Sequence, residues 1–482
     1  MSNSTEPGTV PATRWWVLAT IGIAQLMVVL DTSIVNIALP SAQADLGFSD
    51  SARQWVVTAY ALAFAALLLL GGRLSDLFGR KRAFLVGIVG FAAASALGGA
   101  AGSFGILVTA RTLQGAFAAL LAPAALSLLN TTFTDPHERT KAFGVFGAIG
   151  ASGTVVGLLV GGALTQVLDW RATMYVNVVF SAIALAGGAL LLSNRRDAAG
   201  AALDLPGTIL VSAGLFSLVF GFSNVGTYAW SSPLTWGFLL AGVVLVTAFA
   251  GWQTRARHPL LPLRVLTDRD RAASFATLLI TGAALFGVLL FLTYYLQHDL
   301  GFGPIETGLA FLPMIAVMMV VAQVATGKIV PRTGPKIVLP IGYLLGAVGL
   351  VWLARITVES RYPTDVLPPL LLIGAALGSV IPPAISLATA GVAAADAGVT
   401  SATVNAMQQV GGSIGTAVLN TLATSAAASY LVGKDATDPA VVTQSDLAGY
   451  STAFAWAAGL FLTGGVVTAV VYRRKSSGRD ES

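Results

Sequence analysis

The chain has no cysteine, three histidines and very little charge. Without cysteine it can form neither a disulfide framework nor a thiolate metal site. The histidines, His137, His258 and His298, are far apart in the sequence, so we expect solvated side chains in loops or at helix ends. Charged residues make up 10% of the 482 residues, whereas a soluble domain carries about 25%. A chain with so few charges cannot cover a water-facing surface, which predicts a protein of the lipid bilayer.

Sequence signatures of catalysis are missing as well. We find no phosphate-binding loop of the G-x-x-x-x-G-K-[ST] type, no nucleophile paired with a base and no cluster of histidines and acids. We therefore expect no enzymatic activity, no cofactor, no bound metal and no direct use of ATP. A membrane enzyme, or a receptor that transports nothing, is the alternative from another class of protein.

Long apolar runs are abundant: hydrophobic residues account for 55% of the chain and its mean hydropathy is +0.79. A spanning helix needs about 20 mostly apolar residues. This criterion predicts an all-α polytopic membrane protein with fourteen transmembrane helices. The predicted spans are 15–39, 53–72, 83–101, 104–130, 142–167, 172–193, 206–224, 234–252, 272–297, 305–326, 336–355, 366–388, 400–428 and 450–472.

Positive charge is distributed unevenly among the segments that join these spans. If both termini are cytoplasmic, the cytoplasmic segments carry about four times as many of the 27 Lys and Arg residues as the external ones. This bias predicts that both tails, residues 1–14 and 473–482, face the cytoplasm. It also accounts for the net charge of +5 without nucleic acid, which we do not expect as a partner.

Two similar loops indicate an internal repeat. Residues 72–81 follow the second predicted span and residues 327–336 follow the tenth, at an offset of 255 residues. Each loop has glycines seven residues apart, a base after the first glycine and a lysine two residues after the second. Parallel repeats with a substrate site between them are a known transporter plan. We therefore predict two six-helix bundles, 15–193 and 272–472, with two inserted helices and their loops in 194–271.

A single acid, Asp31, lies inside the first long apolar run. A charge in hydrocarbon is costly unless it is neutralised, paired or faces a cavity, so a functional role is the default interpretation. Arg111 lies within the fourth predicted span. At 1.5 Å per residue, the two residues lie roughly 12 and 11 Å from the outer helix ends. We predict that they can pair and that Asp31 binds a transported proton, with a static ion pair as the alternative.

Four segments in order resemble signatures of the major facilitator superfamily, in its fourteen-helix drug:proton antiporter branch. Residues 72–81 are similar to the family's loop between helices 2 and 3, residues 111–115 to its helix 4 signature, and residues 30–40 to the helix 1 signature of the branch. The glycines of the fifth span are similar to its antiporter signature, except that Leu158 stands where the family usually has proline. The resemblance implies export of drugs or antibiotics coupled to protons.

The antiporter glycines are Gly153, Gly157, Gly161 and Gly162. A spacing of four residues places glycines on one helix face, where a second helix can approach closely. Ordinary bundle packing would produce the same spacing, so it is the alternative. Leu158 removes a source of helix kinking, which leaves the bending of this helix open.

The loop after the second span provides a candidate conformational latch made of Gly72, Asp76, Gly79 and Arg80. A carboxylate at a tight cytoplasmic turn can cap a helix N-terminus and pair with a neighbouring base. We predict that this contact breaks and re-forms as the two bundles rock. A solvated aspartate that only helps to set the topology is the alternative.

Neutral polar and aromatic side chains within the spans form our candidate substrate cavity. Such a lining suits bulky lipophilic compounds. No second acid lies deep within a predicted span, which favours neutral or monovalent substrates. The candidate residues are Gln25, Asn36, Tyr60, Gln114, Phe286, Tyr294, Asn405, Gln408 and Gln409.

These observations predict a proton-coupled antiporter that exports small lipophilic drugs by alternating access. The abundance of Ala, Val and Gly and the excess of arginine over lysine indicate a bacterial source, so we expect the protein in the bacterial plasma (inner) membrane. We also expect a monomer. The alternative with the same fold is proton-coupled transport of a specific metabolite, such as a peptide, sugar or siderophore. More polar residues in the C-terminal half would have favoured that alternative.

Overall fold

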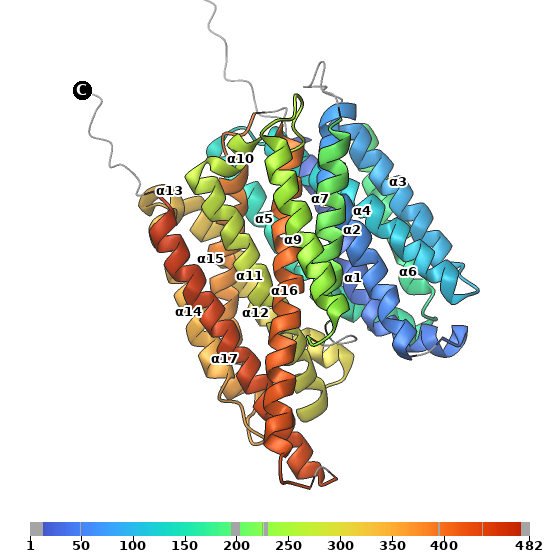
Figure 1. The fold of residues 1–482 in the computed structure, drawn as a ribbon, viewed down its shortest axis with the longest axis vertical. Helices are drawn as coiled ribbons and strands as arrows, with labels where there is room; N and C mark the ends of the chain where they lie inside the picture. Colours follow the sequence, from blue (N-terminus) through green and yellow to red (C-terminus); the bar gives the residue numbers. More distant parts are fainter. Residues whose placement is uncertain are drawn as a thin grey trace, which may run out of the picture.

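The computed structural model describes residues 13–48, 50–193, 203–223, 225, 230–393, 396–435 and 437–473. Over these residues the regular structure is helical, and the long helices run side by side (Figure 1). Twelve helices in the described part of the chain are long and apolar enough to cross a membrane. The protein is therefore an all-helical, multi-pass membrane protein, as the composition predicted.

The helices fall into three consecutive groups. The first consists of α1 (Thr13–Leu46), α2 (Asp50–Phe78), α3 (Arg80–Gly99), α4 (Phe104–Thr132), α5 (Pro136–Val167) and α6 (Ala172–Leu191). The second consists of α7 (Leu205–Ser223), α9 (Pro233–Gln253) and the short α10 (Leu263–Thr267). The third consists of α11 (Arg269–Tyr294), α12 (Pro304–Val324), α13 (Val330–Thr333), α14 (Pro335–Leu353), α15 (Leu367–Thr389), α16 (Ala397–Leu431) and α17 (Pro439–Val471). Three π-helical turns flank helices of the third group: η1 (Tyr295–Asp299), η2 (Ala325–Ile329) and η3 (Tyr362–Val366).

Each of the fourteen predicted spans coincides with a long helix. Two of them, α5 and α16, are not among the twelve apolar helices, although they have 32 and 35 residues. Helix α5 contains the apolar stretch 143–160, part of which lies outside the described residues, and α16 is rich in glycine, serine, threonine and alanine, yet both are long enough to span. Helix number and order therefore agree with the prediction.

Several helices are longer than the apolar runs from which they were predicted. Helix α2 continues to Phe78 instead of ending near residue 72, and α17 begins at Pro439 rather than near residue 450. A helix satisfies its own backbone hydrogen bonds, so it can continue past the point where apolar residues stop. The expected loop 72–81 is corrected accordingly: most of it is the end of α2, and the chain turns at Gly79, where φ is +93°.

Helix packing in the first group is repeated in the third. Helix α1 packs against α5 and α6, and α3 packs against α4 and α6. In the same chain order, α11 packs against α16 and α17, and α14 packs against α15 and α17. Gly79 and Gly334, which are 255 residues apart, both have positive φ, 93° and 83°. These equivalences support two related six-helix bundles, while the bundle boundaries at 193/194 and 271/272 stay a prediction.

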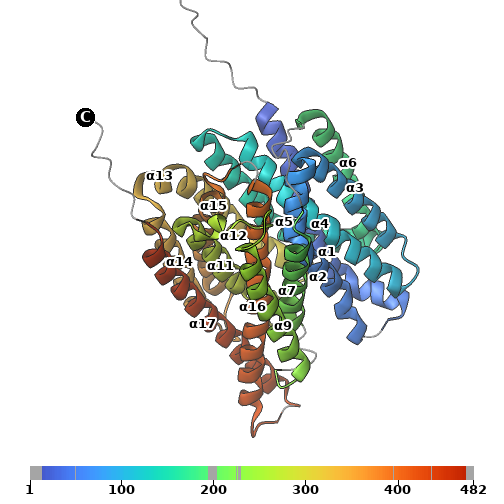
Figure 2. The ribbon, with the colours of Figure 1, turned by 45° about the horizontal axis from the view of Figure 1, so that its top comes forward.

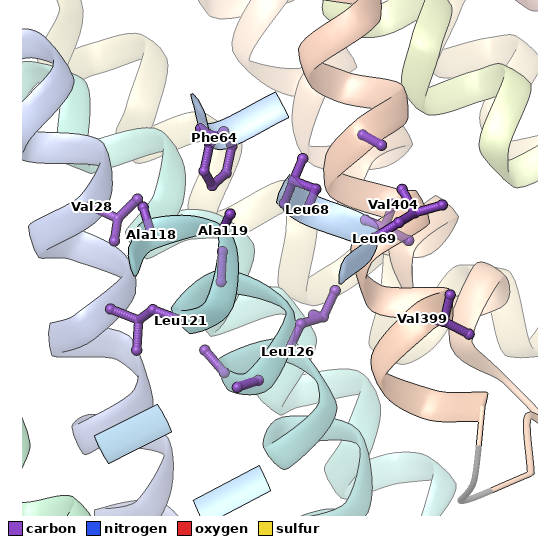
Figure 3. Close-up of a cluster of buried hydrophobic side chains, with 14 of the residues drawn as sticks. Val28, Phe64, Leu68, Leu69, Ala118, Ala119, Leu121, Leu126, Val399 and Val404 are labelled. Carbon is purple, nitrogen blue, oxygen red and sulfur yellow. The ribbon is translucent and has the colours of Figure 1, made fainter. Parts of the chain in front are cut away.

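The two bundles meet along two related seams. Helix α2 of the first bundle packs on α16 of the second, and α5 of the first packs on α12 of the second. Because α12 is the repeat equivalent of α2 and α16 that of α5, the two contacts are related by the repeat. Figure 3 shows Leu68 and Leu69 of α2 close to Val404 of α16, within a buried cluster that also contains Val399. The hydrophobic core of the first bundle therefore continues into the second.

The hairpin of α7 and α9 lies between the bundles on one side (Figures 1 and 2). Helix α7 packs against both α2 and α16, one helix from each bundle. The ring of Phe220 lies 6.1 Å from that of Trp55 in α2, and Trp230 Nε1 donates a hydrogen bond of 2.6 Å to Thr421 Oγ1 in α16. The hairpin thus covers the seam between α2 and α16 and bonds to both sides of it.

A buried carboxylate ties the start of α7 to the end of α9. Asp204 accepts hydrogen bonds from Gly207 N at 3.0 Å, Trp252 Nε1 at 2.8 Å and Gln253 Nε2 at 2.8 Å. Burial alone would raise the pKa of Asp204, but these donors, together with the Leu260 amide, outweigh it and hold the pKa below its ordinary value. The ionised carboxylate therefore stabilises the hairpin.

Substitution Asp204→Ala should lower the free energy of unfolding by roughly 2–3 kcal/mol at neutral pH, since it removes a helix cap and leaves buried donors unpaired. Because the folded-state pKa is depressed, this stabilisation is present above the unfolded pKa of about 3.9 and is lost only as pH falls through the folded value. Thermal unfolding in detergent should therefore show the same deficit at pH 7 and pH 5. A deficit that disappears at pH 5 would contradict the assignment.

Candidate functional site: a buried ion cluster and an inter-bundle cap

The acid in the first span lies at the centre of the first bundle. Asp31 is 0% exposed, and its Oδ2 atom lies 2.6 Å from Nη1 of Arg111 in α4, which is 1% exposed. The structure thus brings together the two residues that their depths placed in one layer. Whether Asp31 carries a transported proton stays a prediction at this point.

Two amides hold the other carboxylate oxygen. Asp31 Oδ1 accepts hydrogen bonds from Gln114 Nε2 at 3.0 Å and from Asn177 Nδ2 of α6 at 2.6 Å. Gln114 also accepts from Arg111 Nη1 at 2.9 Å and donates to Ser95 Oγ of α3 at 2.7 Å. All of these side chains are buried. The ionised carboxylate therefore has three donors, which is how a protein can hold a charge away from water.

Arg111 is anchored independently of the acid. Its Nε atom donates to the carbonyl oxygen of Val56 in α2 at 3.1 Å, and its guanidinium carbon lies 4.5 Å from the centre of the Tyr60 ring. A cation over an aromatic face is attracted by the ring's quadrupole. The guanidinium can therefore keep its place when the charge on Asp31 changes.

The sequence analysis missed two members of this cluster, Ser95 and Asn177. Each is a polar residue within an apolar helix, 0% exposed, and Asn177 is flanked by valines in α6. Polar residues are frequent in the predicted spans, so depth alone does not single out these two.

The antiporter glycines pack against the segment of α1 that carries the acid. A Cβ atom at Gly157 would lie 2.8 Å from Ser33 Cβ and 3.0 Å from Leu30 O. At Gly153 it would meet Val29, and at Gly161 it would meet Ile34. The first three glycines of the motif thus allow α5 to approach α1 at Asp31. Gly162 faces α12 instead, where an added Cβ atom would lie 3.8 Å from Ile305 Cγ1.

The predicted latch residue bonds to the opposite bundle. Asp76 is buried in the last turn of α2, where Oδ1 accepts from Gly398 N at 2.9 Å and Oδ2 accepts from Val399 N at 3.3 Å. These amides belong to the first turn of α16, whose unpaired N–H groups and dipole favour a carboxylate. Asp76 thus caps the N-terminus of α16, and it lies within a helix rather than at the expected turn, while its role as a latch stays a prediction.

The geometry around this cap is close and charged. A Cβ atom at Gly72 would lie 2.7 Å from Ala402 Cβ, so the two backbones can approach only because a glycine is present. Arg73 and Arg80 are buried and interact electrostatically with Asp76. Gly72, Asp76 and Arg80 therefore lie at one contact between the bundles, and Gly79 provides the turn that leads into α3.

The cap has no equivalent in the second repeat. Pro331 occupies the position 255 residues after Asp76, and α5 begins with its own Asp135, which accepts from Glu138 N at 2.9 Å. In α16 the residue before the helix, Asp396, makes no capping bond and instead pairs with Arg264 at 2.7 Å. Its helix end is therefore open to Asp76 from the other bundle.

The structure divides the candidate cavity residues. Tyr60 and Gln114 contact the ion cluster, and Tyr294 is 42% exposed with its ring against His298, while a role of these three in binding substrate stays a prediction. The side chains of Asn36, Phe286 and Leu158 lie outside the described residues. A role in binding substrate stays a prediction for the half-buried Gln25, Asn405, Gln408 and Gln409.

Two repeated helical bundles with a buried ion cluster in one of them define a membrane transport protein of the secondary-transporter class. Within the described residues there is no group of three or more His, Cys, Asp or Glu that could hold a metal ion. Residues 21–416 match the Major Facilitator Superfamily. The chain belongs to this family of transporters, which confirms the resemblance seen in its motifs and the expected transport rather than enzymatic activity.

Similar proteins include two that are named for resistance to an antibiotic or for its export. A puromycin resistance protein of Streptomyces alboniger is 47% identical over 471 residues, which cover 97% of this chain and 93% of that protein. A cephamycin export protein of Amycolatopsis lactamdurans is 38% identical over 402 residues, 83% of each chain. The crystal structure of the human organic anion transporter MFSD10 shares the fold, with a TM-score of 0.63 at 17% identity, and covers 95% of this chain and 100% of that one.

Substitution Gly157→Ala should disturb the close packing of α5 against α1 beside Asp31. The added Cβ would force α5 away from Ser33 and Leu30, which we expect to cost about 1–3 kcal/mol of stability and to impair transport. Gly162→Ala is the matched control, because its Cβ would make only an ordinary contact with Ile305. Thermal unfolding and drug export of the two variants would be compared. Equal effects would contradict the assigned helix faces.

Proposed function

We propose that this protein exports lipophilic drugs, antibiotics in particular, across the bacterial plasma membrane in exchange for protons. Relatives named for resistance to puromycin and for export of cephamycin support the substrate class. The excess of positive charge in alternate loops supports cytoplasmic termini. Both bundles and the ion cluster lie within one chain, which supports a monomer as the working unit. The observation that carries the proton coupling is the buried pair of Asp31 and Arg111.

The proton binds to Asp31 and changes the electrostatics of the first bundle. In the ionised state the carboxylate balances Arg111 and accepts from two amides. Protonation removes the negative charge and turns one acceptor position into a donor, so the cluster must rearrange. An acid whose proton depends on hydration and on its partners is suited to take up a proton from outside and release it inside.

The contact between Asp76 and the start of α16 has to break when the two bundles separate. It joins the end of α2 to the start of α16 through two hydrogen bonds from backbone N–H groups, and a hydrogen bond is typically worth about 0.5–1.5 kcal/mol. Since this contact lies at the end of the molecule that we assign to the cytoplasm, the conformation described here is closed on that side. Alternate closure and opening at this contact would expose the drug site to one side of the membrane at a time.

The membrane potential is sufficient to drive such an exchange. Moving one charge through 100 mV supplies about 2.3 kcal/mol. For a neutral drug exchanged against one proton, that energy supports a gradient of roughly fifty-fold before any pH difference is added.

Substitution Asp31→Asn should abolish resistance to exported drugs, since the amide cannot take up and release a proton. The measurement is a drug-susceptibility profile, with puromycin in the panel, of cells expressing the wild type or the variant at equal levels. Asp45→Asn is the matched control because Asp45 also lies on α1 and pairs with Arg171 at 2.7 Å, but its side chain is 46% exposed. Resistance that survives Asp31→Asn for every drug would contradict proton coupling at this residue.

Substitution Asp76→Ala should weaken closure between the bundles. The chain has no cysteine, so cysteines introduced at Phe78 and Ile337, which are exposed residues of the two bundles, can be spin-labelled alone. We expect the distance distribution between the labels to broaden towards longer values. Drug export should fall about tenfold, which corresponds to about 1.4 kcal/mol lost with the two hydrogen bonds. Asp438→Ala, which removes an exposed cap within α17, should leave the distribution unchanged. An unchanged distribution in Asp76→Ala would contradict the latch.

A further inference from the structure

The partners of Asp31 differ in how freely they can turn. Gln114 is held at both ends: its Nε2 atom donates to Asp31 and to Ser95, and its Oε1 atom accepts from Arg111. Reversing this amide would break three hydrogen bonds and would place its NH₂ group against a guanidinium. Gln114 is therefore fixed as a donor to Asp31.

Asn177 is held at one end. Its Nδ2 atom donates to Asp31 Oδ1 at 2.6 Å, while its Oδ1 atom is buried and has no hydrogen-bond partner among the described residues. The residue is 0% exposed in this conformation. A half-turn of the amide gives up one hydrogen bond and presents a free acceptor to the carboxyl group.

Protonation of Asp31 creates a need for such an acceptor. An ionised carboxylate only accepts hydrogen bonds, whereas a protonated one has an O–H group that must donate. A buried donor without a partner is costly. The oxygen that faces the amides would then meet two donors, Gln114 Nε2 and Asn177 Nδ2, unless one of them turns.

We infer that Asn177 is a positioning residue for the proton: it donates to ionised Asp31 and, after a half-turn of its amide, accepts from protonated Asp31. This inference rests on the proposed proton exchange. The proton adds to Asp31 Oδ1 and leaves from it, and no other bond is made or broken. Because the asparagine can hydrogen-bond to both forms of Asp31, it stabilises the ionised and the protonated state alike and allows the proton to bind and dissociate.

Asn177 is the residue best placed for this role. The charged and titratable side chains at the cluster are Arg111, which keeps its bonds to Val56 and Gln114, and Tyr60, whose ring centre lies 4.5 Å from the guanidinium carbon. The hydroxyl of Tyr60 is also buried without a hydrogen-bond partner among the described residues, but it makes no hydrogen bond to Asp31 there. Helix α5 approaches with Gly157, and α3 contributes the hydroxyl of Ser95, which is taken by Gln114. Of these residues, Asn177 both bonds to the acid and has an unused acceptor.

The test compares Asn177→Val with Asn177→Thr, two side chains of the same shape. The threonine hydroxyl can rotate to donate or to accept, and the valine methyl can do neither. The purified full-length variants would be reconstituted in proteoliposomes, and puromycin-driven proton movement would be recorded across pH 5.5–8.5, beside puromycin exchange without a gradient and the melting temperature. We expect proton movement to fall at least about tenfold in Asn177→Val and to stay within about threefold of wild type in Asn177→Thr. Gradient-free exchange and melting temperature should be alike in the two variants.

Other outcomes decide between the inference and the proposed function. Equal proton movement in the two variants, whether both are active or both impaired, overturns the role of Asn177 while the wild type remains a proton-coupled exporter. A wild type that moves no puromycin, or moves it without protons, contradicts the proposed function and removes the inference with it. If gradient-free puromycin exchange falls in Asn177→Val, relative to Asn177→Thr, by as much as proton movement does, the valine variant has a packing defect. That result also overturns the inference.

Discussion

A negative charge placed in the middle of a membrane helix has to be compensated, and this requirement organises the first bundle. Asp31 is compensated by Arg111, and the two are surrounded by amides and a hydroxyl from α3, α4 and α6. Breaking a buried pair by removing one partner typically costs about 3–5 kcal/mol. The cluster therefore holds together the helices that contribute to it, α1, α2, α3, α4 and α6. Under the proposed function, the same cost lets a proton on Asp31 change the arrangement of these helices, because a neutral acid no longer needs its cation.

The second polar contact links this bundle to the other one. Asp76 caps α16 from outside, while the helix's own Asp396 is engaged by Arg264. The second repeat has Pro331 at the equivalent position and no such cap, so the two seams between the bundles differ in polar bonding although their helix packing is alike. The α7–α9 hairpin covers the seam of α2 and α16, the side of the molecule on which Asp76 closes the bundles. The internal repeat thus accounts for the helix packing that the two bundles share, and the differences between its halves account for contacts such as the Asp76 cap.

Much of this arrangement was predictable from sequence, for identifiable reasons. Apolar runs revealed every spanning helix because the hydrocarbon layer requires about 20 such residues, and depth along α1 and α4 placed Asp31 level with Arg111. Helix ends were misplaced, since a helix continues beyond its apolar stretch, as α2 does to Phe78. The partner of Asp76 lies 322 residues away, and no local pattern indicates it. Asn177 was overlooked because a single amide among valines resembles ordinary packing until the carboxylate beside it is seen.

Proton release on drug binding is the most direct measure of the central claim, that Asp31 exchanges its proton in response to the drug. Purified protein in weakly buffered detergent solution would be mixed with drug, and released protons would be counted with a pH-indicator dye. The account predicts about one proton per bound drug for the wild type and none for Asp31→Asn, with drug binding retained in both. Equal release from the two proteins would show that the proton comes from another group and would contradict the account.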